Sequence, residues 1–557
     1  MNSMIYIMTI LGVNYVVLSQ INMSQDMFHL SFVGLLIIEY VVYMLYIKQY
    51  YKSNDRLYYY RSWFMGSYPN YFGLTEGNRW TPSFIVKQKM KGDLEVDRFR
   101  FDYTVRNRFR WYSLGKYFED FKCSIKSKSL VYSAIVFGQM GAGKSEFYYW
   151  LITQNTCNRY FLYDSKGDFT QMLFKSKRDI ILNPYDERTS FWNPFEEAQY
   201  SEQVIEIFMT NLFNAIAGDK KDFFSSSSRD RYMTIFNEIA YLHKDKNPKE
   251  KFNMFIEELN LYFDEVAKMD RGSEKDVVST MQLTFKFFEY MNFCIQKEDS
   301  KTFTITEFLK SKNSKLFLLD REEYKATLKP FYTAFIATFS AILLSKEDNK
   351  EDLTMFGLDE FLTFAKNIDD DILEGMFTRL RSKGGCLLPG VQYFPTGGKN
   401  EELTQKLLNS ASYFFLFQGI DTYTLERINK TIGKTKYKQQ SPSSKKDEER
   451  YQVAEADLLN VSIFQSLGEK FEHITFIPKN KILYKGYTPQ AKLKKINESF
   501  IRSSYLEEYW IDKKGPDFSS KKNNDEELSH TGAKANKQKT LLENQKDEVE
   551  SVVKFEL

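Results

Sequence analysis

The sequence predicts an α/β nucleotide-binding domain that is interrupted by a helical insertion and preceded by a transmembrane helical hairpin. Three observations lead to this prediction. A short apolar run at 134–137 opens into a glycine-rich loop and a helix, further apolar runs alternate with helical patterns, and two long apolar segments lie within residues 1–47. Strands that alternate with helices are typical of a mainly parallel sheet covered by helices.

Two apolar segments lie near the N-terminus. Met27–Ile47 has the length that spans a bilayer core, and we interpret it as a transmembrane helix. Met4–Leu18 is shorter, and a signal peptide is the competing interpretation of this segment. It lacks a basic leading region and no good small-residue cleavage site follows it, so we prefer a two-helix hairpin. Basic residues follow the second segment, whereas Asp26 is the only charge in the connecting loop, which places the rest of the chain in the cytoplasm.

The composition excludes several simple classes of protein. The chain of 557 residues carries 77 Lys and Arg against 74 Asp and Glu, so its net charge of +3 gives no whole-chain argument for nucleic-acid binding. The four cysteines are far apart and contain no C-x-x-C pair. This pattern favours reduced thiols in a cytosolic compartment, without structural zinc or a disulfide framework.

The glycine-rich loop matches the phosphate-binding pattern G-x-x-x-x-G-K-[ST] at every fixed position. Glycine lets successive backbone N–H groups curve around phosphate oxygens, Lys144 brings a positive charge to the β- and γ-phosphates, and Ser145 brings a hydroxyl to Mg²⁺. The helix that follows points the positive end of its dipole at the same place. The expected nucleotide-binding residues are Gly138, Gln139, Met140, Gly141, Ala142, Gly143, Lys144, Ser145 and Glu146.

A second apolar strand pattern, Leu353–Leu358, ends in Asp359 and Glu360. A P-loop ATPase needs such a strand beside its glycine-rich loop. We expect Asp359 to hold Mg²⁺ together with Ser145, and Glu360 to take the proton from the attacking water.

Two further residue types suit the same chemistry. Gln392 follows a strand that begins at Cys386, and a glutamine at that position can sense the γ-phosphate. Arg379 and Arg381 precede this strand, and an arginine there can reach across a subunit boundary to neutralise charge in the transition state. Each of these residues alone could equally be an ordinary polar group.

Other segments complete the predicted organisation. Apolar runs at 160–163, 180–182, 315–319 and 413–417 predict further strands, and 164–168 forms a charged turn of the kind that faces the ligand crevice of an α/β sheet. The predicted parts are a transmembrane hairpin at 1–50, a linker with strands at 51–128, the first part of the nucleotide-binding domain at 129–195, an all-α inserted domain at 196–312, its second part at 313–510 and a disordered charged tail at 511–557.

The sequence contains two basic segments whose roles remain open. Arginines within 98–110 alternate with aromatic residues and could line a nucleic-acid groove or form a solvated face beside anionic lipid. Residues 435–451, which combine lysines with a serine-containing run, predict a mobile basic loop.

The order of these motifs resembles the TraD/TrwB type of type IV secretion coupling protein, within the FtsK/HerA-like superfamily. The likeness covers roughly residues 130–435 and lies in GQMGAGKSE, YDSKGDF, ILNPYDERTSFWNPF, a helical insertion, GLDEF and TRLRSKGG leading to GVQ. It implies a RecA-like P-loop domain in a homohexameric ATPase with ATP and Mg²⁺ as cofactors. The resemblance also implies a multi-pass inner-membrane protein with its motor in the cytoplasm.

The resemblance assigns roles by motif. Lys144 and Ser145 would bind phosphates and Mg²⁺, Asp359 and Glu360 would be the metal-binding and water-activating acids, and Gln392 would be the sensor. Arg381 would be the trans arginine finger, with Arg379 as its rival. The implied partners are single-stranded DNA or a relaxase–DNA complex, and the proteins of a type IV secretion channel.

The resemblance thus implies an ATPase that pumps single-stranded DNA in conjugation, and two alternatives remain open beside this function. The same motor could move protein effectors, or the chain could be a membrane docking protein whose nucleotide site gates assembly without translocase activity. A small-molecule kinase is disfavoured because no acceptor lid follows the loop, and an ABC-type ATPase because no LSGGQ-like segment is present.

Overall fold

The computed structural model describes residues 59–60, 70–71, 74–76, 80–81, 83–103, 117–201, 203–217, 223–268, 272–365, 368, 370–440, 451–467 and 471–514, together with Ser31. The predicted hairpin, apart from Ser31, and residues 515–557 of the predicted disordered tail lie outside the described residues. The prediction of a disordered tail is wrong for residues 511–514, which belong to the helix α18 (Ser504–Lys514). Within this described part, Glu322–Ser345 is long and apolar enough to cross a membrane by length and composition, and 72% of its most apolar window is buried inside the protein.

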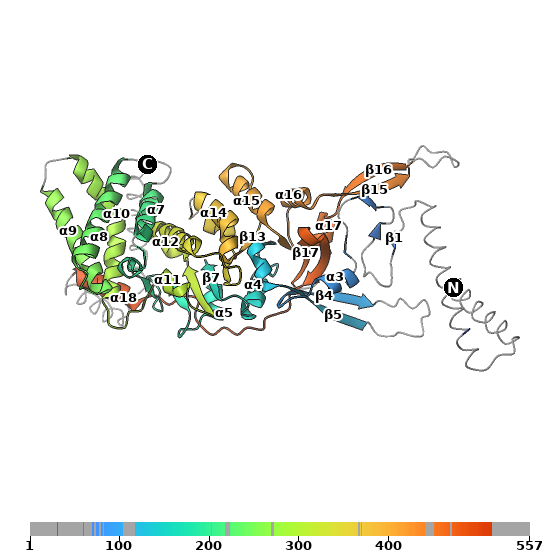
Figure 1. Cartoon of the computed structure of the whole chain (residues 1–557), viewed down its shortest axis with the longest axis horizontal. Coiled ribbons are helices and arrows are strands. Elements are labelled where there is room, and N and C mark those ends of the chain that lie inside the picture. The colour runs from blue at the N-terminus through green and yellow to red at the C-terminus, as the bar shows by residue number, and fades with distance from the viewer. Residues whose placement is uncertain are drawn as a thin grey trace, which may run out of the picture. The chain divides into compact units, whose positions relative to one another are not determined.

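The chain forms two compact units. The first comprises Met1–Asp179, Leu309–Leu318 and Phe335–Asn497, and the second comprises Ile180–Phe308, Leu319–Ala334 and Glu498–Leu557. Figure 1 labels some of the elements of both units.

Ten strands of the first unit lie in one sheet, in the order β5-β4-β18-β17-β14-β6-β13-β12-β7-β11. Their bounds are β4 (Leu94–Tyr103), β5 (Tyr117–Ile125), β6 (Ala134–Phe137), β7 (Arg159–Asp164), β11 (Ser314–Leu319), β12 (Thr354–Leu358), β13 (Gly385–Val391), β14 (Tyr413–Phe417), β17 (Glu472–Ile477) and β18 (Ile482–Tyr487). The central part of this sheet is parallel: each strand in the order β14-β6-β13-β12-β7 runs parallel to the next. From β14 through β17, β18 and β4 to β5 the pairing is antiparallel.

The parallel strands form the centre of the core. Every residue of β6, β7, β12 and β14 is buried. Such continuous apolar strands are typical of a sheet covered on both faces. The carboxyl ends of parallel strands share one edge of the sheet, so the segments that follow β6, β13, β12 and β7 meet there.

Helices of the first unit connect these strands. They are α3 (Ser83–Lys89), α4 (Lys144–Thr153), α5 (Asp168–Leu173), α13 (Phe361–Ala365), α14 (Asp370–Arg379), α15 (Gly398–Ser410), α16 (Thr422–Ile432), α17 (Val461–Gln465) and the part of α12 (Lys325–Ser345) from Phe335 onward. The 3₁₀ helices η1 (Ser127–Tyr132), η3 (Leu380–Lys383) and η4 (Pro478–Asn480) also belong here.

A small second sheet corrects one sequence prediction. The strands β15 (Lys434–Gln440) and β16 (Tyr451–Asp457) pair antiparallel, and β15 also pairs with β3 (Leu74–Glu76). The predicted mobile loop over 435–451 is therefore wrong for residues 435–440 and 451, and its residues 441–450 lie outside the described residues. Lysines at 434, 436 and 438 alternate with Thr435 and Tyr437, which is the period of a strand. A separate short pair joins β1 (Tyr59–Tyr60) to β2 (Asn70–Tyr71).

The second unit is rich in helices, and α8, α9 and α10 lie side by side (Figure 1). Its helices are α6 (Pro194–Glu197), α7 (Gln203–Ala217), α8 (Phe223–Leu242), α9 (Pro248–Ala267), α10 (Gly272–Ile295), α11 (Ile305–Phe308), α18 (Ser504–Lys514) and the 3₁₀ helix η2 (Glu322–Tyr324). The strands β8 (Ile180–Leu182), β9 (Phe191–Trp192) and β10 (Thr302–Phe303) also belong to it, and β9 pairs with β10 in parallel. Phenylalanine rings fill the helical core, as the stacking of Phe195 on Phe236 at 4.1 Å illustrates.

Candidate nucleotide-binding site

The glycine-rich loop connects the buried strand β6 to α4, as the sequence predicts. Gly143 caps α4 with a φ of 110°, and Gly141 has a φ of 80°. Both values lie in the left-handed region that side chains with a Cβ rarely adopt. A Cβ atom on Gly143 would lie 2.6 Å from Cδ1 of Phe471, so the neighbouring ring also requires glycine at this position.

Lys144 lies inside the curve of the loop. Its Nζ donates hydrogen bonds to the carbonyl oxygens of Gly138 at 2.6 Å and Gln139 at 3.1 Å. Burial lowers the pKa of Lys144, and the carboxylate of Asp359 acts in the opposite direction. The loop therefore places one positive charge beside the backbone N–H groups at the start of α4, an arrangement that suits the binding of a phosphate.

Asp359 follows β12 and lies beside the start of α4. The hydroxyl of Ser145 donates a hydrogen bond of 3.0 Å to Oδ2 of Asp359. The other oxygen, Oδ1, is buried and has no hydrogen-bond partner in the described part of the chain. Burial raises the pKa of Asp359, although Lys144 and Ser145 oppose the shift. A buried carboxylate oxygen without a donor, next to a hydroxyl, offers the oxygen ligands that Mg²⁺ prefers, so these residues fit the ion.

Glu360 is held by the turn that follows β7. Its carboxylate lies 2.7 Å from Nζ of Lys166, and this hydrogen bond raises the pKa of Lys166. Asp164 has a different part in the same turn. It accepts hydrogen bonds from the backbone N–H groups of Gly167 and Thr170 and from the Thr170 hydroxyl, and its burial raises its pKa to about 6. Asp164 therefore shapes the turn that delivers Lys166.

One cavity of about 270 Å³ collects most of these groups. Its lining residues are Met140, Gly141, Gly143, Lys144, Ser145, Glu146, Tyr149, Lys166, Asp359, Glu360, Gln392, Phe471 and Gln490. The edge of the sheet thus brings together the loop, both acids and the glutamine, although they are far apart in the sequence.

Several predicted residues lie outside this lining. Gly138, Gln139 and Ala142 belong to the loop, but the first two contribute carbonyl groups to Lys144. Arg381 belongs to η3, and its guanidinium carbon lies 3.9 Å from the centre of the Tyr132 ring. Within a single chain Arg381 is therefore not part of the cavity.

Three lining residues were missed by sequence reasoning. Phe471 and Gln490 come from the segments before β17 and after β18, two strands that the sequence analysis did not predict. Tyr149 belongs to α4 and donates a hydrogen bond to the Asp168 carbonyl. None of the three belongs to a recognisable motif. The alternation of apolar residues in 472–477 was the available signal for the neighbouring strand.

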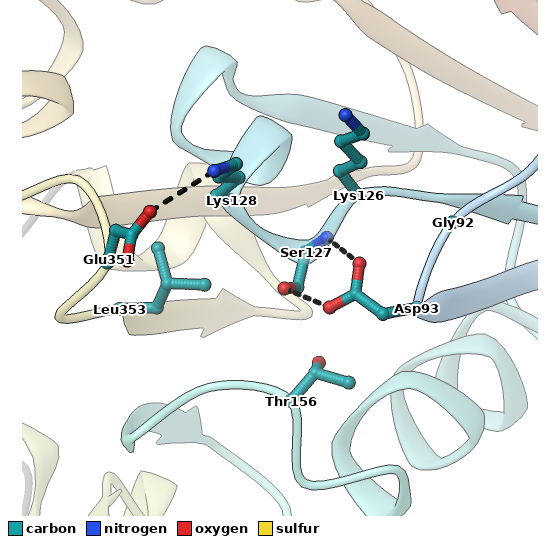
Figure 2. A pocket seen from close by; sticks show the side chains of 8 residues that line it. All are labelled: Gly92, Asp93, Lys126, Ser127, Lys128, Thr156, Glu351 and Leu353. Atoms are coloured by element: carbon teal, nitrogen blue, oxygen red, sulfur yellow. Dashed lines mark hydrogen bonds and ion pairs between the residues drawn. The ribbon is translucent and has the colours of Figure 1, made fainter.

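A second cavity, of about 510 Å³, lies elsewhere in the first unit (Figure 2). The carboxylate of Asp93 accepts hydrogen bonds from the backbone N–H and hydroxyl of Ser127, and Lys128 pairs with Glu351 at 3.1 Å. This second cavity shares no lining residue with the first cavity, and the two carboxylates that line it, Asp93 and Glu351, are paired with neighbouring side chains. We assign no chemistry to it.

Residues 122–456, more than half of the chain, match the family model described as the type IV secretion-system coupling protein DNA-binding domain. The chain belongs to the type IV secretion coupling proteins. The resemblance seen in the sequence motifs is thereby confirmed. Coupling protein TraD of Escherichia coli (strain K12) is 25% identical over 279 residues, which are 46% of this chain and 37% of TraD. The chain thus matches little more than a third of the length of that curated coupling protein.

Solved structures of the coupling protein TrwB share the fold. The unbound monoclinic form of TrwBΔN70 has a TM-score of 0.57 at 16% identity, over 79% of this chain and 98% of that chain. TrwB in complex with the non-hydrolysable ATP analogue ADPNP has a TM-score of 0.56 at 16% identity, over 79% and 99%. TrwB in complex with ADP and Mg²⁺ has a TM-score of 0.55 at 16% identity, over 79% and 100%. The predicted mixed α/β fold of a coupling protein is confirmed.

Proposed function

We propose that the chain is an inner-membrane, hexameric ATPase that passes single-stranded DNA, free or bound to a relaxase, to a type IV secretion channel. The observation that carries the proposal is the 3.0 Å hydrogen bond from Ser145 to Asp359 in the cavity that also holds Lys144 and Glu360. A cation site, a phosphate-binding lysine and a carboxylate base are the parts that ATP hydrolysis needs. The complexes of TrwB with ADPNP and with ADP and Mg²⁺ support this choice of ligands.

Each residue has a defined part in this proposal. Lys144 binds the β- and γ-phosphates, while Ser145 and Asp359 would hold Mg²⁺, which supplies positive charge to the phosphates when it is bound. Glu360 accepts the proton of the attacking water, which requires its carboxylate to exchange Lys166 for that water. Gln392 lies directly after β13 and senses the γ-phosphate.

Arg381 has a part in the proposed ring. Its guanidinium lies over Tyr132 and outside the cavity of its own chain. We propose that it serves the cavity of a neighbouring subunit, where a positive charge stabilises the transition state. The hairpin at 1–50 as membrane anchor belongs to the same proposal, and so does the inserted domain at 196–312, which is helical apart from the short strand β10 and so corrects the predicted all-α composition.

The proposed cargo is DNA. The matching family model is described as a DNA-binding domain, which favours DNA over protein effectors. A docking protein without hydrolysis is disfavoured because Glu360 lines the same cavity as Lys144 and Asp359.

The test is ATP hydrolysis by the detergent-solubilised full-length protein, with and without single-stranded DNA and at two salt concentrations. We expect DNA to stimulate hydrolysis and added salt to reduce the stimulation, because phosphate contacts release counterions. The Lys144→Ala variant is the background control. A hexamer that does not hydrolyse ATP under any of these conditions contradicts the motor, and stimulation by protein substrates but not by DNA contradicts the cargo.

A further inference from the structure

Tyr132 and Arg381 lie at the edge of the sheet opposite to the nucleotide cavity. Tyr132 ends the helix η1, two residues before β6 begins, and Arg381 belongs to η3, which precedes β13. The glycine-rich loop and Gln392 follow the carboxyl ends of these two parallel strands. The seven residues of β13 separate the two edges by roughly 23 Å, since a strand rises about 3.3 Å per residue. The Arg381 side chain therefore cannot reach the cavity of its own chain.

The guanidinium of Arg381 packs on an aromatic ring. Its central carbon lies 3.9 Å from the centre of the Tyr132 ring, well within the range of a cation–π contact. Arg381 is exposed, and it forms no ion pair with an acid in the part of the chain that the structure describes. Stacking uses the flat face of the guanidinium and leaves its N–H donors for an anion. Tyr132 thus holds the side chain without neutralising its charge.

Other basic side chains near this ring differ in whether an acid pairs with them. Nζ of Lys128, in η1, lies 3.1 Å from the carboxylate of Glu351. Nζ of Lys479 lies 5.7 Å from the centre of the same Tyr132 ring and, like Arg381, pairs with no acid among the described residues. Two positive charges that share one ring repel each other, and an anion that approaches both would relieve the repulsion.

The backbone around Tyr132 is firmly held. Its carbonyl oxygen accepts a hydrogen bond of 3.1 Å from the N–H of Ser412, directly before β14. The next residue, Ser133, has a φ of 59°, a left-handed conformation that persists only where neighbours enforce it. The Tyr132 hydroxyl forms no hydrogen bond within the described residues, so the ring alone supports Arg381.

Arg379, the rival for the trans role, is placed differently. A Cβ atom added to Gly375 would lie 2.9 Å from Nη2 of Arg379, so the Arg379 side chain lies back along its own helix α14. Arg381, in contrast, is supported on a ring outside that helix. The structure therefore distinguishes the two arginines that the sequence left as rivals.

We propose that Tyr132 is a positioning residue that holds Arg381 in place for the nucleotide of a second copy of this chain, with Lys479 as a further cation on the same surface. The inference rests on the proposed ATPase site and on the trans role of Arg381. The occupant is the triphosphate end of the neighbour's nucleotide, an anion that matches two cations without acids. Because this surface and the cavity lie at opposite edges of one sheet, copies joined through them meet head to tail, as the subunits of a ring do.

The first test is ATP hydrolysis by the detergent-solubilised full-length protein in the presence of single-stranded DNA. We expect Tyr132→Leu to lower kcat about 5- to 30-fold, the factor that corresponds to a cation–π contact shielded from water. Tyr132→Phe keeps the ring and should retain the original kcat, as should Lys128→Ala, the matched control from η1. ADPNP binding by Tyr132→Leu should be unchanged, because the cavity of its own chain is intact.

Mixed rings identify the subunit that Tyr132 serves. A Tyr132→Leu subunit has an intact cavity and a misplaced arginine. Mixing it with Lys144→Ala subunits should therefore raise the activity above that of either variant alone, whereas mixing it with Arg381→Ala subunits should not. The opposite pattern, or loss of ADPNP binding in Tyr132→Leu, overturns the inference, because Tyr132 would then act on its own glycine-rich loop through β6.

The remaining outcomes separate the inference from the proposals beneath it. The original kcat in Tyr132→Leu, or an equal loss in Tyr132→Phe, overturns the positioning role of the ring and leaves the ATPase proposal intact. Failure of Arg381→Ala and Lys144→Ala subunits to restore activity to each other overturns the trans role of Arg381. Absence of hydrolysis by the unchanged protein overturns the ATPase proposal itself.

Discussion

The Nζ atom of Lys166 lies 2.7 Å from Oε1 of Glu360, so the turn after β7 holds the acid that follows β12. This ion pair keeps the Glu360 carboxylate at the cavity, next to the groups that bind phosphate and metal. The pair joins the ends of two neighbouring parallel strands.

We expect Glu360→Gln to lower kcat for ATP hydrolysis by about 10²- to 10⁴-fold, because glutamine cannot accept the proton of water. ADPNP binding should be retained, since Lys144, Ser145 and Asp359 are unchanged. Steady-state kinetics and ADPNP titration check both parts. Hydrolysis at the original rate in this variant would place the base elsewhere.

Two glycines of the loop provide a matched pair. Gly141 and Gly143 both have positive φ, but a Cβ on Gly141 meets nothing within 4 Å, whereas one on Gly143 meets the ring of Phe471. Each alanine substitution should cost about 1–2 kcal/mol of conformational strain. In addition, Gly143→Ala should displace Phe471 and weaken ADPNP binding more than Gly141→Ala does. Equal affinities in the two variants would show that the contact with Phe471 is unimportant.

Arg381 should act between subunits. We expect Arg381→Ala alone to lose most of its ATPase activity, and mixed rings of Arg381→Ala and Lys144→Ala subunits to recover part of it. Such a mixture contains interfaces that combine an intact cavity with an intact arginine. Arg379→Ala is the matched control and should retain activity. If no mixed ring hydrolyses ATP, the trans assignment fails.

The stability of the folded protein should depend on pH through Asp164, because burial raises the pKa of its carboxyl group. Its pKa is raised from 3.8 to about 6, so the folded state holds the proton more tightly than the unfolded chain does. Its contribution to stability is therefore greatest below about pH 4 and decreases as the pH rises to about 6, by about 3 kcal/mol.

The carboxamide of Asp164→Asn does not titrate, so the variant should lack this pH dependence. Denaturant unfolding of both proteins between pH 4 and pH 7, followed by tryptophan fluorescence, measures the difference. A difference in unfolding free energy that stays constant across this range would contradict the shifted pKa.

The sequence predicts the centre of the site well because local patterns determine it. The strand at 134–137 with its glycine-rich loop and the strand that ends in Asp359 lie in the sheet as expected, and so does the strand before Gln392. Parallel neighbours deliver such residues to one edge without further information. The predicted linker at 51–128 likewise contains a strand, β4 (Leu94–Tyr103).

The other half of the site could not be predicted from local patterns. Phe471 and Gln490 reach the cavity because β17 and β18 join the sheet antiparallel beside β14. Asp97, which lies in β4 and far away in the sequence, accepts hydrogen bonds from Thr475 in β17 and Tyr484 in β18 and so links both strands to β4. The prediction of a loop at 435–440 failed for the same reason, because the strand β15 forms by pairing with the distant segment 451–457.

The lining of the nucleotide cavity extends along the chain from Met140 to Gln490, and the Ala491 N–H closes it against Glu146. During synthesis the glycine-rich loop leaves the ribosome roughly 350 residues before the segment that completes its cavity. A nascent or truncated chain that ends before residue 488 lacks this wall. Nucleotide can therefore occupy the complete cavity only after synthesis has passed Gln490, close to the end of the first unit.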